Sequence, residues 1–184
     1  MNYIGNATTY LTENLLGIAL YIVLIRFWMQ WVRANFRNPV GQFIITVTNP
    51  VVIPLRRLLP SIGSIDTATV VFAFSLAVFK TFVLVSIAGG FVPIVKLLVY
   101  SFGEIVKDSI YIFMGAIFIQ IIASWVNPYS NHPILEIARS IAEPLMAPAR
   151  RIIPAIAGID LSPILVFIFL NLSLQLIVAP LQAY

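Results

Sequence analysis

The residues with the greatest chemical potential in this sequence are basic. Lys80 and Arg26 lie inside long apolar stretches, where a charged side chain is costly and needs protein or water contacts. Four further arginines form two pairs, each bracketed by prolines: Arg56, Arg57, Arg150 and Arg151. Next to an anionic membrane surface, each basic residue contributes about 1 kcal/mol of attraction. These residue types therefore favour contacts with anions rather than a reaction.

Patterns typical of catalysis or metal binding are missing from the sequence. The chain has no cysteine and a single histidine, which excludes thiolate ligands, cysteine nucleophiles and histidine clusters. Asp66 and Asp160 are lone carboxylates, and two separate aspartates do not make an acid/base pair. We therefore expect a protein that is not an enzyme and that has no metal or other cofactor.

The elements that must position these residues belong to a membrane. Of the 184 residues, 60% are hydrophobic and 10% are charged, against roughly 45–50% and 25% in ordinary soluble domains. A helix that crosses the hydrocarbon core takes about 17–25 residues, and backbone groups in lipid must be satisfied within the helix. Four apolar stretches are long enough: Leu15–Val32, Ala68–Val92, Ser109–Val126 and Ile164–Leu181. The predicted fold class is all-α, an integral membrane protein with four transmembrane helices.

The distribution of basic residues predicts the orientation of the chain. The two connections at 33–67 and 127–163 carry seven arginines, whereas Lys96 and Lys107 are the only basic residues predicted on the other side. The positive-inside rule places both connections in the cytoplasm and both termini on the opposite side. The basic excess suggests contact with anionic lipid and no direct contact with nucleic acid.

The chain contains an internal repeat with a shift of 94 residues. Eleven identities align without a gap, and eight of them are Trp, Pro, Arg or Asp, which shared apolar composition does not explain. This pattern indicates a tandem duplication with units at 1–92 and 93–184. Each unit has two spans, so we expect a parallel repeat about an axis along the membrane normal.

Each connection between spans is predicted to hold an interfacial helix and a proline-rich turn. Residues 39–49 and 133–143 begin with proline, and the second is clearly amphipathic, as expected for a helix in the headgroup plane. Residues 50–60 and 144–154 carry prolines at fixed intervals, which we expect to exclude a continuous regular helix. Three residues before the following spans are predicted to define helix starts, namely Asp66, Asp160 and Ser162. Alternatively, each aspartate pairs with an arginine of its own unit.

Two interpretations of the basic residues remain open. Lys80 is about 18 Å from the start of its predicted span; it and Arg26 either snorkel and contact backbone carbonyls or line a polar track with Gln120, Asn171 and Gln175. None of the four predicted spans contains an acidic residue, so an anion contact is favoured over a cation pathway. The arginine pairs either bind lipid or a partner, or they only set the topology.

The chain also resembles the YggT family of small bacterial membrane proteins, which has relatives in plastids. The residues that carry the resemblance are Arg26-Phe27-Trp28, Asn38-Pro39, Thr48-Asn49-Pro50, Pro54-Leu55-Arg56 with Pro60, and Gly158 through Pro163. The chain departs from the pattern where Ser-Pro is missing before the second span and where Gln120 stands at the position of Arg26. The resemblance implies a multi-pass protein of the bacterial inner membrane without established catalytic activity. Relatives are linked to assembly of membrane complexes such as plastid cytochromes, to cell division or nucleoid organisation, and to osmotic or potassium tolerance.

The sequence thus leads to two functional hypotheses. The first is a non-enzymatic protein that organises or assembles membrane complexes and contacts anionic lipid through its Pro/Arg turns. Its partners would be anionic lipids, other membrane proteins and further copies of the chain. The alternative is a component of an ion or osmolyte transporter or channel, motivated by Lys80 and Arg26.

Overall fold

Four long apolar helices dominate the computed structural model, which describes residues 3–63, 65–127, 131–153 and 160–183. They are α1 (Tyr3–Trp31), α3 (Thr67–Ile87), α4 (Ile94–Val126) and the segment Ser162–Gln182. That last segment comprises α6 (Ser162–Ser173), a π-helical turn η1 (Leu174–Val178) and α7 (Ala179–Gln182). Two further helices, α2 (Pro39–Leu58) and α5 (Pro133–Ile152), connect the spans within each unit. The all-helical class and the four helices able to span a membrane are confirmed.

The first and third of these helices are longer than the sequence indicates. α1 begins at Tyr3 rather than Leu15, and α4 begins at Ile94 rather than Ser109. Apolarity marks only the part of a helix that suits hydrocarbon, whereas the backbone hydrogen bonds continue through polar residues. With 33 residues and a rise of 1.5 Å per residue, α4 is about 50 Å long and exceeds a hydrocarbon core of about 30 Å.

The second span ends earlier than expected, at Ile87 rather than Val92, because Gly89 closes the helix. Gly89 has a φ of 70°, which glycine adopts without steric cost. Its amide donates to the Ser86 carbonyl, and the amide of the next residue donates to Val85, both at 3.0 Å. This is the hydrogen-bond pattern of a Schellman cap.

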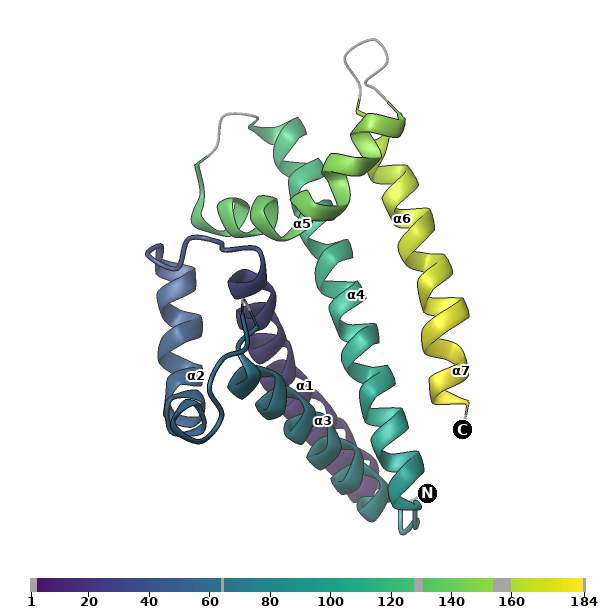
Figure 1. Ribbon diagram of the computed structural model, residues 1–184. Coiled ribbons are helices and arrows are strands. Elements are labelled where there is room, and N and C mark those ends of the chain that lie inside the picture. Colours follow the sequence, from purple (N-terminus) through teal and green to yellow (C-terminus); the bar gives the residue numbers. More distant parts are fainter. Residues whose placement is uncertain (1–2, 64, 128–130, 154–159, 184) are drawn as a thin grey trace.

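The expected break of the connecting helices at their prolines is wrong. α2 continues through Pro50 and Pro54, and α5 continues through Pro144 and Pro148. Each proline removes one backbone donor but keeps a helical φ, and a helix accommodates this by bending. α5 visibly changes direction along its length (Figure 1). The arginine pairs therefore lie in the last turn of a long bent helix rather than in an irregular turn.

The helices form two neighbouring units with both termini at one end (Figure 1). α1 packs along α3 within the first unit, where the small residues Ala73 and Ala77 are buried and allow close approach. α4 contacts α3 of the first unit as well as α5 and the α6–α7 segment of its own. α1 and α4 run in the same direction, as a parallel repeat requires (Figure 1).

A polar contact joins the first connection to the second unit. Asn35 and Asn38 donate their side-chain amides to the two carboxylate oxygens of Glu136 on α5, at 2.9 and 3.1 Å. These two hydrogen bonds lower the pKa of Glu136 below its ordinary value. Asn38 also caps α2, because its side-chain oxygen accepts the Gly41 amide at 2.7 Å. One residue therefore fixes both the start of α2 and its position against α5.

Candidate functional site

The arginine corner of the first unit is built by α2 and the start of α3. Arg56, in the last turn of α2, donates from Nη2 to Asp66 Oδ2 at 2.6 Å and from Nε to both carboxylate oxygens at 3.2 Å. Thr69 donates to the same Oδ2 at 2.5 Å. The side chain of Asp66 is fully buried, whereas that of Arg56 is 41% exposed. Asp66 stands at the N-cap of α3 but makes no side-chain capping bond, and its carboxylate instead pairs with an arginine ten residues away.

Hydrogen bonding decides the charge state of Asp66, which stands just before α3. Burial alone raises the pKa of this carboxyl, but the hydrogen bonds from Arg56 and Thr69 and the positive charge of Arg56 outweigh that effect. The net result is a pKa below the ordinary value of 3.8. Asp66 is therefore an anion at neutral pH and fixes the Arg56 guanidinium at the end of α2.

The second unit repeats this corner in a more open form. Arg150 donates from Nε to Asp160 Oδ2 at 3.2 Å and from Nη1 to both oxygens of Glu143 at 3.1 Å. Asp160 accepts the Ser162 amide at 2.9 Å, and this bond together with Arg150 lowers its pKa despite partial burial. The Ser162 hydroxyl donates to the Ile153 carbonyl at 3.3 Å instead of capping α6. Residues 154–159, which carry the remaining motif positions from Pro154 to Ile159, lie outside the described residues.

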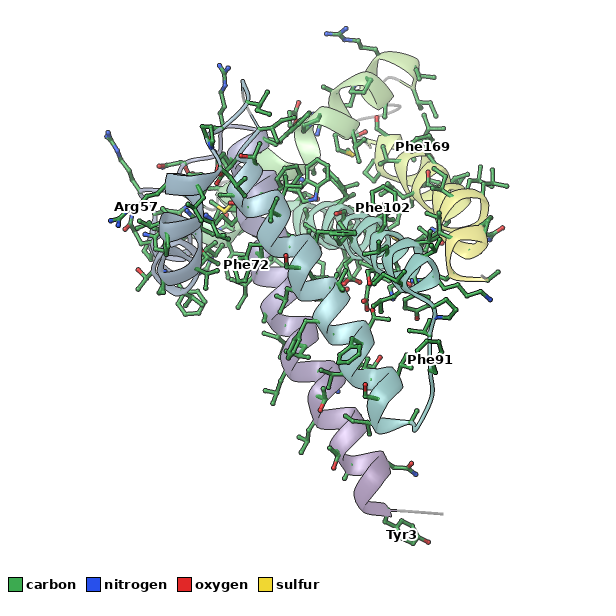
Figure 2. All side chains as sticks on the ribbon, turned by 60° about the horizontal axis from the view of Figure 1, so that its bottom comes forward. Tyr3, Arg57, Phe72, Phe91, Phe102 and Phe169 are labelled. Carbon is green, nitrogen blue, oxygen red and sulfur yellow. The ribbon has the colours of Figure 1, made fainter. Side chains whose placement is uncertain are left out.

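The second arginine of each pair points away from the protein. Arg57 and Arg151 are exposed, and each follows an arginine that an aspartate holds in place. Figure 2 shows the Arg57 side chain extending outward from the end of α2. The ion pair of the first arginine with its aspartate therefore fixes the backbone position from which the second, exposed arginine extends.

Of the other predicted polar residues, Arg26 lies close to the first corner. It is 4% exposed, and its Nη1 donates to the Thr48 hydroxyl and, at 2.9 Å, to Asn49 Oδ1. Both partners belong to α2, so Arg26 ties α1 to the middle of the connecting helix. Both of these hydrogen bonds go to side chains rather than to backbone carbonyls.

The polar track predicted around Lys80 is not assembled. Gln120 donates to the Ala138 carbonyl at 3.1 Å. Asn171 is exposed and donates to the Phe167 carbonyl of its own helix, and Gln175 is exposed as well. Lys80 instead contacts α4, where its Nζ is 2.7 Å from Glu104 Oε1.

A carboxylate partner for Lys80 was not expected, because the predicted third span began only at Ser109. Both side chains are nearly buried, with 8% exposure for Lys80 and 7% for Glu104. Thr81 and Ser101 extend the cluster through weak hydrogen bonds of 3.4 Å. One available signal was the placement of Glu104 and Asp108 four residues apart, which puts both on one helix face.

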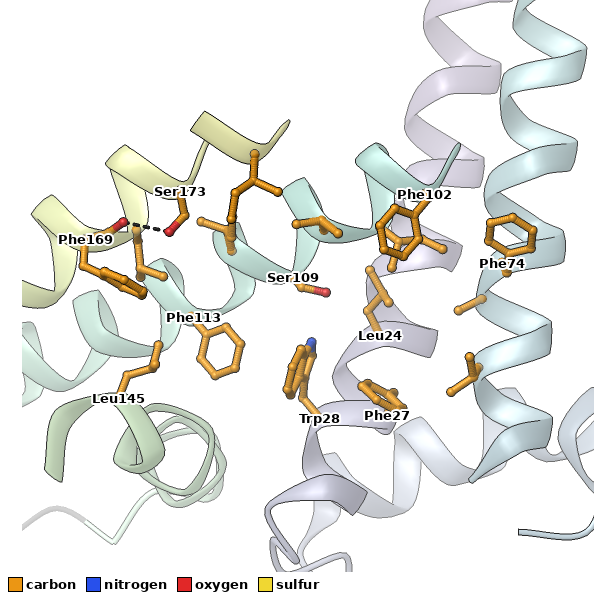
Figure 3. A pocket seen from close by; sticks show the side chains of 17 residues that line it. Leu24, Phe27, Trp28, Phe74, Phe102, Ser109, Phe113, Leu145, Phe169 and Ser173 are labelled. Carbon is orange, nitrogen blue, oxygen red and sulfur yellow. Dashed lines mark hydrogen bonds between the residues drawn. The ribbon is translucent and has the colours of Figure 1, made fainter. Parts of the chain in front are cut away.

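An apolar cavity of about 500 Å³ lies between the two units. Figure 3 shows Trp28 of α1 next to Phe113 of α4, with Phe169 of α6 beyond Phe113 and Phe27 of α1 on the opposite side of Trp28. The rings of Trp28 and Phe113 pack edge to face, with 4.7 Å between the ring centroids. The indole Nε1 of Trp28 is buried and has no hydrogen-bond partner among the described residues.

Comparison with known proteins gives the family. A model of the CCB3/YggT family matches residues 5–87 and again residues 99–181. The chain is 39% identical over 181 residues to "Uncharacterized protein in proC 3'region" of Vibrio alginolyticus, with 96% of this chain and 97% of the relative covered. It is 33% identical over 178 residues to "Uncharacterized protein YggT" of Escherichia coli K12, with 97% and 93% covered. The chain belongs to the CCB3/YggT family. No solved structure matches it.

The two YggT matches fall inside the predicted units, one in each. Each match contains one arginine pair and the aspartate that holds its first member. The corner is therefore the part of the YggT unit that both halves of this chain share. The boundary of the units at residues 92 and 93 stays a prediction.

The two YggT units differ in how the corner is filled. In the first unit Arg26 occupies the space between α1 and α2. In the second unit Gln120 takes the equivalent position, and a cavity of about 680 Å³ remains there. Its lining combines apolar residues with Arg139, Arg150 and Asp160. The duplication has thus produced one closed corner and one open corner.

Proposed function

We propose that this YggT protein is a non-enzymatic organiser of membrane complexes in the bacterial inner membrane, and that its arginine corners contact anionic lipid at the cytoplasmic face. The observation that carries the proposal is the repeated geometry of the corner. In both units an aspartate holds the first arginine, and the second arginine is exposed at the end of a bent amphipathic helix. This arrangement presents a charge at a defined place on the protein.

Fixing the first arginine favours recognition over simple attraction. A freely moving guanidinium loses side-chain entropy when it binds, whereas a positioned one has lost part of it already. Arginine also offers donors in a planar fork that matches phosphate oxygens. The last turn of a helix is itself suited to basic residues, because the helix dipole is negative there. Each corner is therefore preorganised for a phosphate-bearing partner.

The open corner of the second unit supports a lipid headgroup as that partner. Its cavity of about 680 Å³ has room for a polar headgroup and is lined by Arg139 and Arg150 beside the carboxylate of Asp160. Apolar residues complete the lining, which suits the glycerol and the first acyl carbons of a lipid. In the closed first corner Arg56 is 41% exposed but held by Asp66, so Arg57 is the exposed arginine of that pair that is outside the ion pair.

Lipid retention measured by native mass spectrometry tests the lipid contact. Arg57→Gln and Arg151→Gln each remove one exposed charge, and at about 1 kcal/mol per basic residue each is expected to weaken binding of an anionic phospholipid about fivefold. Arg37→Gln is the matched control, since it removes one exposed charge from the same connection outside the corner. Equal losses for Arg57→Gln and Arg37→Gln would show that only total charge matters and would refute the corner as a site.

The organising role has its own test. Site-specific photocrosslinkers at positions 57 and 151 in native membranes are expected to capture the same membrane protein from independent preparations, with position 37 as the control. If neither corner position yields a reproducible protein partner, the assembly role is wrong even where lipid binding is found.

Transport of an ion or osmolyte is the second candidate, and the buried Lys80–Glu104 pair favours it. A cavity of about 330 Å³ reaches Glu104 from the end of the bundle that carries the termini and is lined there by Glu13 and Lys96. Intramembrane ionisable residues beside water-filled cavities are typical of ion pathways. Purified proteoliposomes should then show flux that Lys80→Leu abolishes. Absence of flux in the unmodified protein would dispose of this candidate.

A further inference from the structure

One buried carboxylate has no role in the corners or in the Lys80–Glu104 pair. Asp108 lies one turn after Glu104 on α4 and is only 4% exposed. Its Oδ1 accepts a hydrogen bond from the Tyr21 hydroxyl of α1 at 3.3 Å. Its Oδ2 is buried and has no hydrogen-bond partner within the part of the chain that the structure describes. An anionic carboxylate in this position would be poorly compensated.

The charges around Asp108 do not balance. Lys80 contributes one positive charge, whereas Glu104 and Asp108 together contribute two negative charges when both are ionised. Lys80 already forms an ion pair with Glu104, with 2.7 Å between Nζ and Oε1. The buried side chains therefore carry one negative charge in excess, because the other nearby cation, Lys107, is only half-buried. In a low-dielectric interior such a charge is costly.

The remaining ionisable groups near Asp108 do not remove this excess. Tyr21 faces it from α1 and Lys80 from α3, while α4 itself supplies Glu104, Lys107 and Tyr111. The packed segment Ser162–Gln182 contains no ionisable side chain. Among the neighbouring charges Lys107 acts most strongly on Asp108. Lys107 is half-buried, however, and as the adjacent residue in sequence it projects about 100° away around the helix. It lines the cavity and belongs to none of the ion pairs among the described residues.

We infer that Asp108 binds a proton at Oδ2, and that this proton-binding site lies between α1 and α3 of the first unit and α4 of the second. Binding forms one O–H bond, takes one proton from water and brings the cluster to neutrality without any change in oxidation state. The site needs neither the lipid contact of the corners nor transport, so it stands apart from both proposed functions.

The surroundings favour a proton over a metal ion. The described residues contain no group of three or more His, Cys, Asp or Glu side chains that could hold a metal. Hard cations such as Mg²⁺ and Ca²⁺ require about six or more oxygen ligands. A proton needs only the one oxygen that is left without a partner.

A route for proton exchange exists next to the site. The cavity of about 330 Å³ is lined by Glu104 and Lys107 as well as by the exposed Glu13 and Lys96 near the start of α4. The cavity extends to the turn of α4 that precedes Asp108, which gives water a path to that turn. The site is also specific to the junction of the units, because residue 14, which aligns with Asp108 in the first unit, is an exposed asparagine.

Infrared spectroscopy of the full-length protein in nanodiscs tests the inference. At neutral pH the unmodified protein is expected to show the C=O band of a protonated carboxylic acid, which shifts in D₂O. Asp108→Asn should abolish the band, Asp108→Glu should move it, and the control Glu13→Gln should leave it unchanged. Lys80→Met should roughly double it, since two carboxylates then share an interior without a cation.

Two outcomes would overturn the proton site. The first is the absence of this band in the unmodified protein, or its persistence in Asp108→Asn. The second is a band that disappears when Na⁺ or K⁺ replaces choline at constant pH, because the site would then hold a metal cation. Circular dichroism of Asp108→Asn checks that the helices are retained, and Asp108→Glu keeps the test decisive if that variant does not fold.

Discussion

The pair of Lys80 and Glu104 should contribute more to stability than any other polar contact between the spans. Lys80→Met removes the ammonium and leaves the Glu104 carboxyl group without its partner at 2.7 Å, in a site where both side chains are less than a tenth exposed. Glu104 then has to take up a proton or remain an unpaired buried charge, and either outcome destabilises the fold. Removing one partner of a buried ion pair costs about 3–5 kcal/mol. Glu104→Gln should cost a similar amount, because it leaves the ammonium unpaired.

The double variant Lys80→Met/Glu104→Gln distinguishes the pair from its parts. It leaves no unpaired charge at these two positions. The double variant should therefore lose less free energy of unfolding than the two single losses added together, and the difference, the coupling energy, should be about 2–3 kcal/mol. Hydrogen bonds between membrane helices average about 0.6 kcal/mol in such cycles, and a coupling of 2 kcal/mol or more therefore indicates paired charges.

Unfolding in mixed micelles, followed by circular dichroism, measures this cycle. The control is the exposed pair Arg150–Glu143, whose side chains are 41% and 54% exposed. Solvent screens that pair, so its coupling should stay below about 1 kcal/mol. A coupling at Lys80–Glu104 no larger than that of the control would refute the argument that burial makes this pair strong.

Three further predictions concern the first unit. Folding lowers the pKa of Asp66, so its contribution to stability is complete above the ordinary value of 3.8 and is lost as the pH falls through the lower folded value. Asp66→Asn should remove this loss of stability at acid pH. The same variant should cost about 1–3 kcal/mol at neutral pH. Arg33→Gly should stabilise the protein by about 1 kcal/mol, because Arg33 ends α1 with a φ of 55° that glycine adopts without strain. Gly41→Ala should destabilise it by about 1–3 kcal/mol, since the new Cβ would lie 2.8 Å from the Phe36 Cα.

Thermal unfolding in detergent at several pH values checks all three. Unchanged acid sensitivity in Asp66→Asn would show that another group controls it. A lower midpoint for Arg33→Gly would mean that contacts of the arginine outweigh its backbone strain. Full stability of Gly41→Ala would mean that the 35–38 segment moves aside at little cost.

Most of the fold can be predicted from the hydropathy and the internal repeat, because both depend on local sequence. The four apolar stretches and the shared Trp, Pro, Arg and Asp positions require no knowledge of packing. The proline-rich segments do not reveal their structure from sequence, since a helix that bends at Pro144 and Pro148 has the same residues as a broken one. The pairing of each aspartate with an arginine of its own unit was one of two alternatives that the sequence left open.

The contact of Lys80 with Glu104 could not be predicted from the sequence. Glu104 and Asp108 lower the local hydropathy, so the predicted span started after them, although α4 begins at Ile94. Their burial depends on how α4 of the second unit packs against α3 of the first. The repeat gives no help there, because the residue aligned with Lys80 is Leu174 and the residue aligned with Glu104 is Tyr10.

The contact of Asn35 and Asn38 with Glu136 makes the junction of the two halves directional. The aligned positions are Tyr129, His132 and Gln42, and Gln42 offers an amide where Glu136 offers a carboxylate. The equivalent contact, from the second half to residue 42 of the first half, therefore has no carboxylate acceptor. The interface between the halves is heterologous rather than self-complementary. A gene encoding either half alone should fail to replace the whole by pairing with itself. Co-expression of the two different halves should restore the junction. The two halves therefore have different roles in the interface, which the identical subunits of a symmetric dimer would not have.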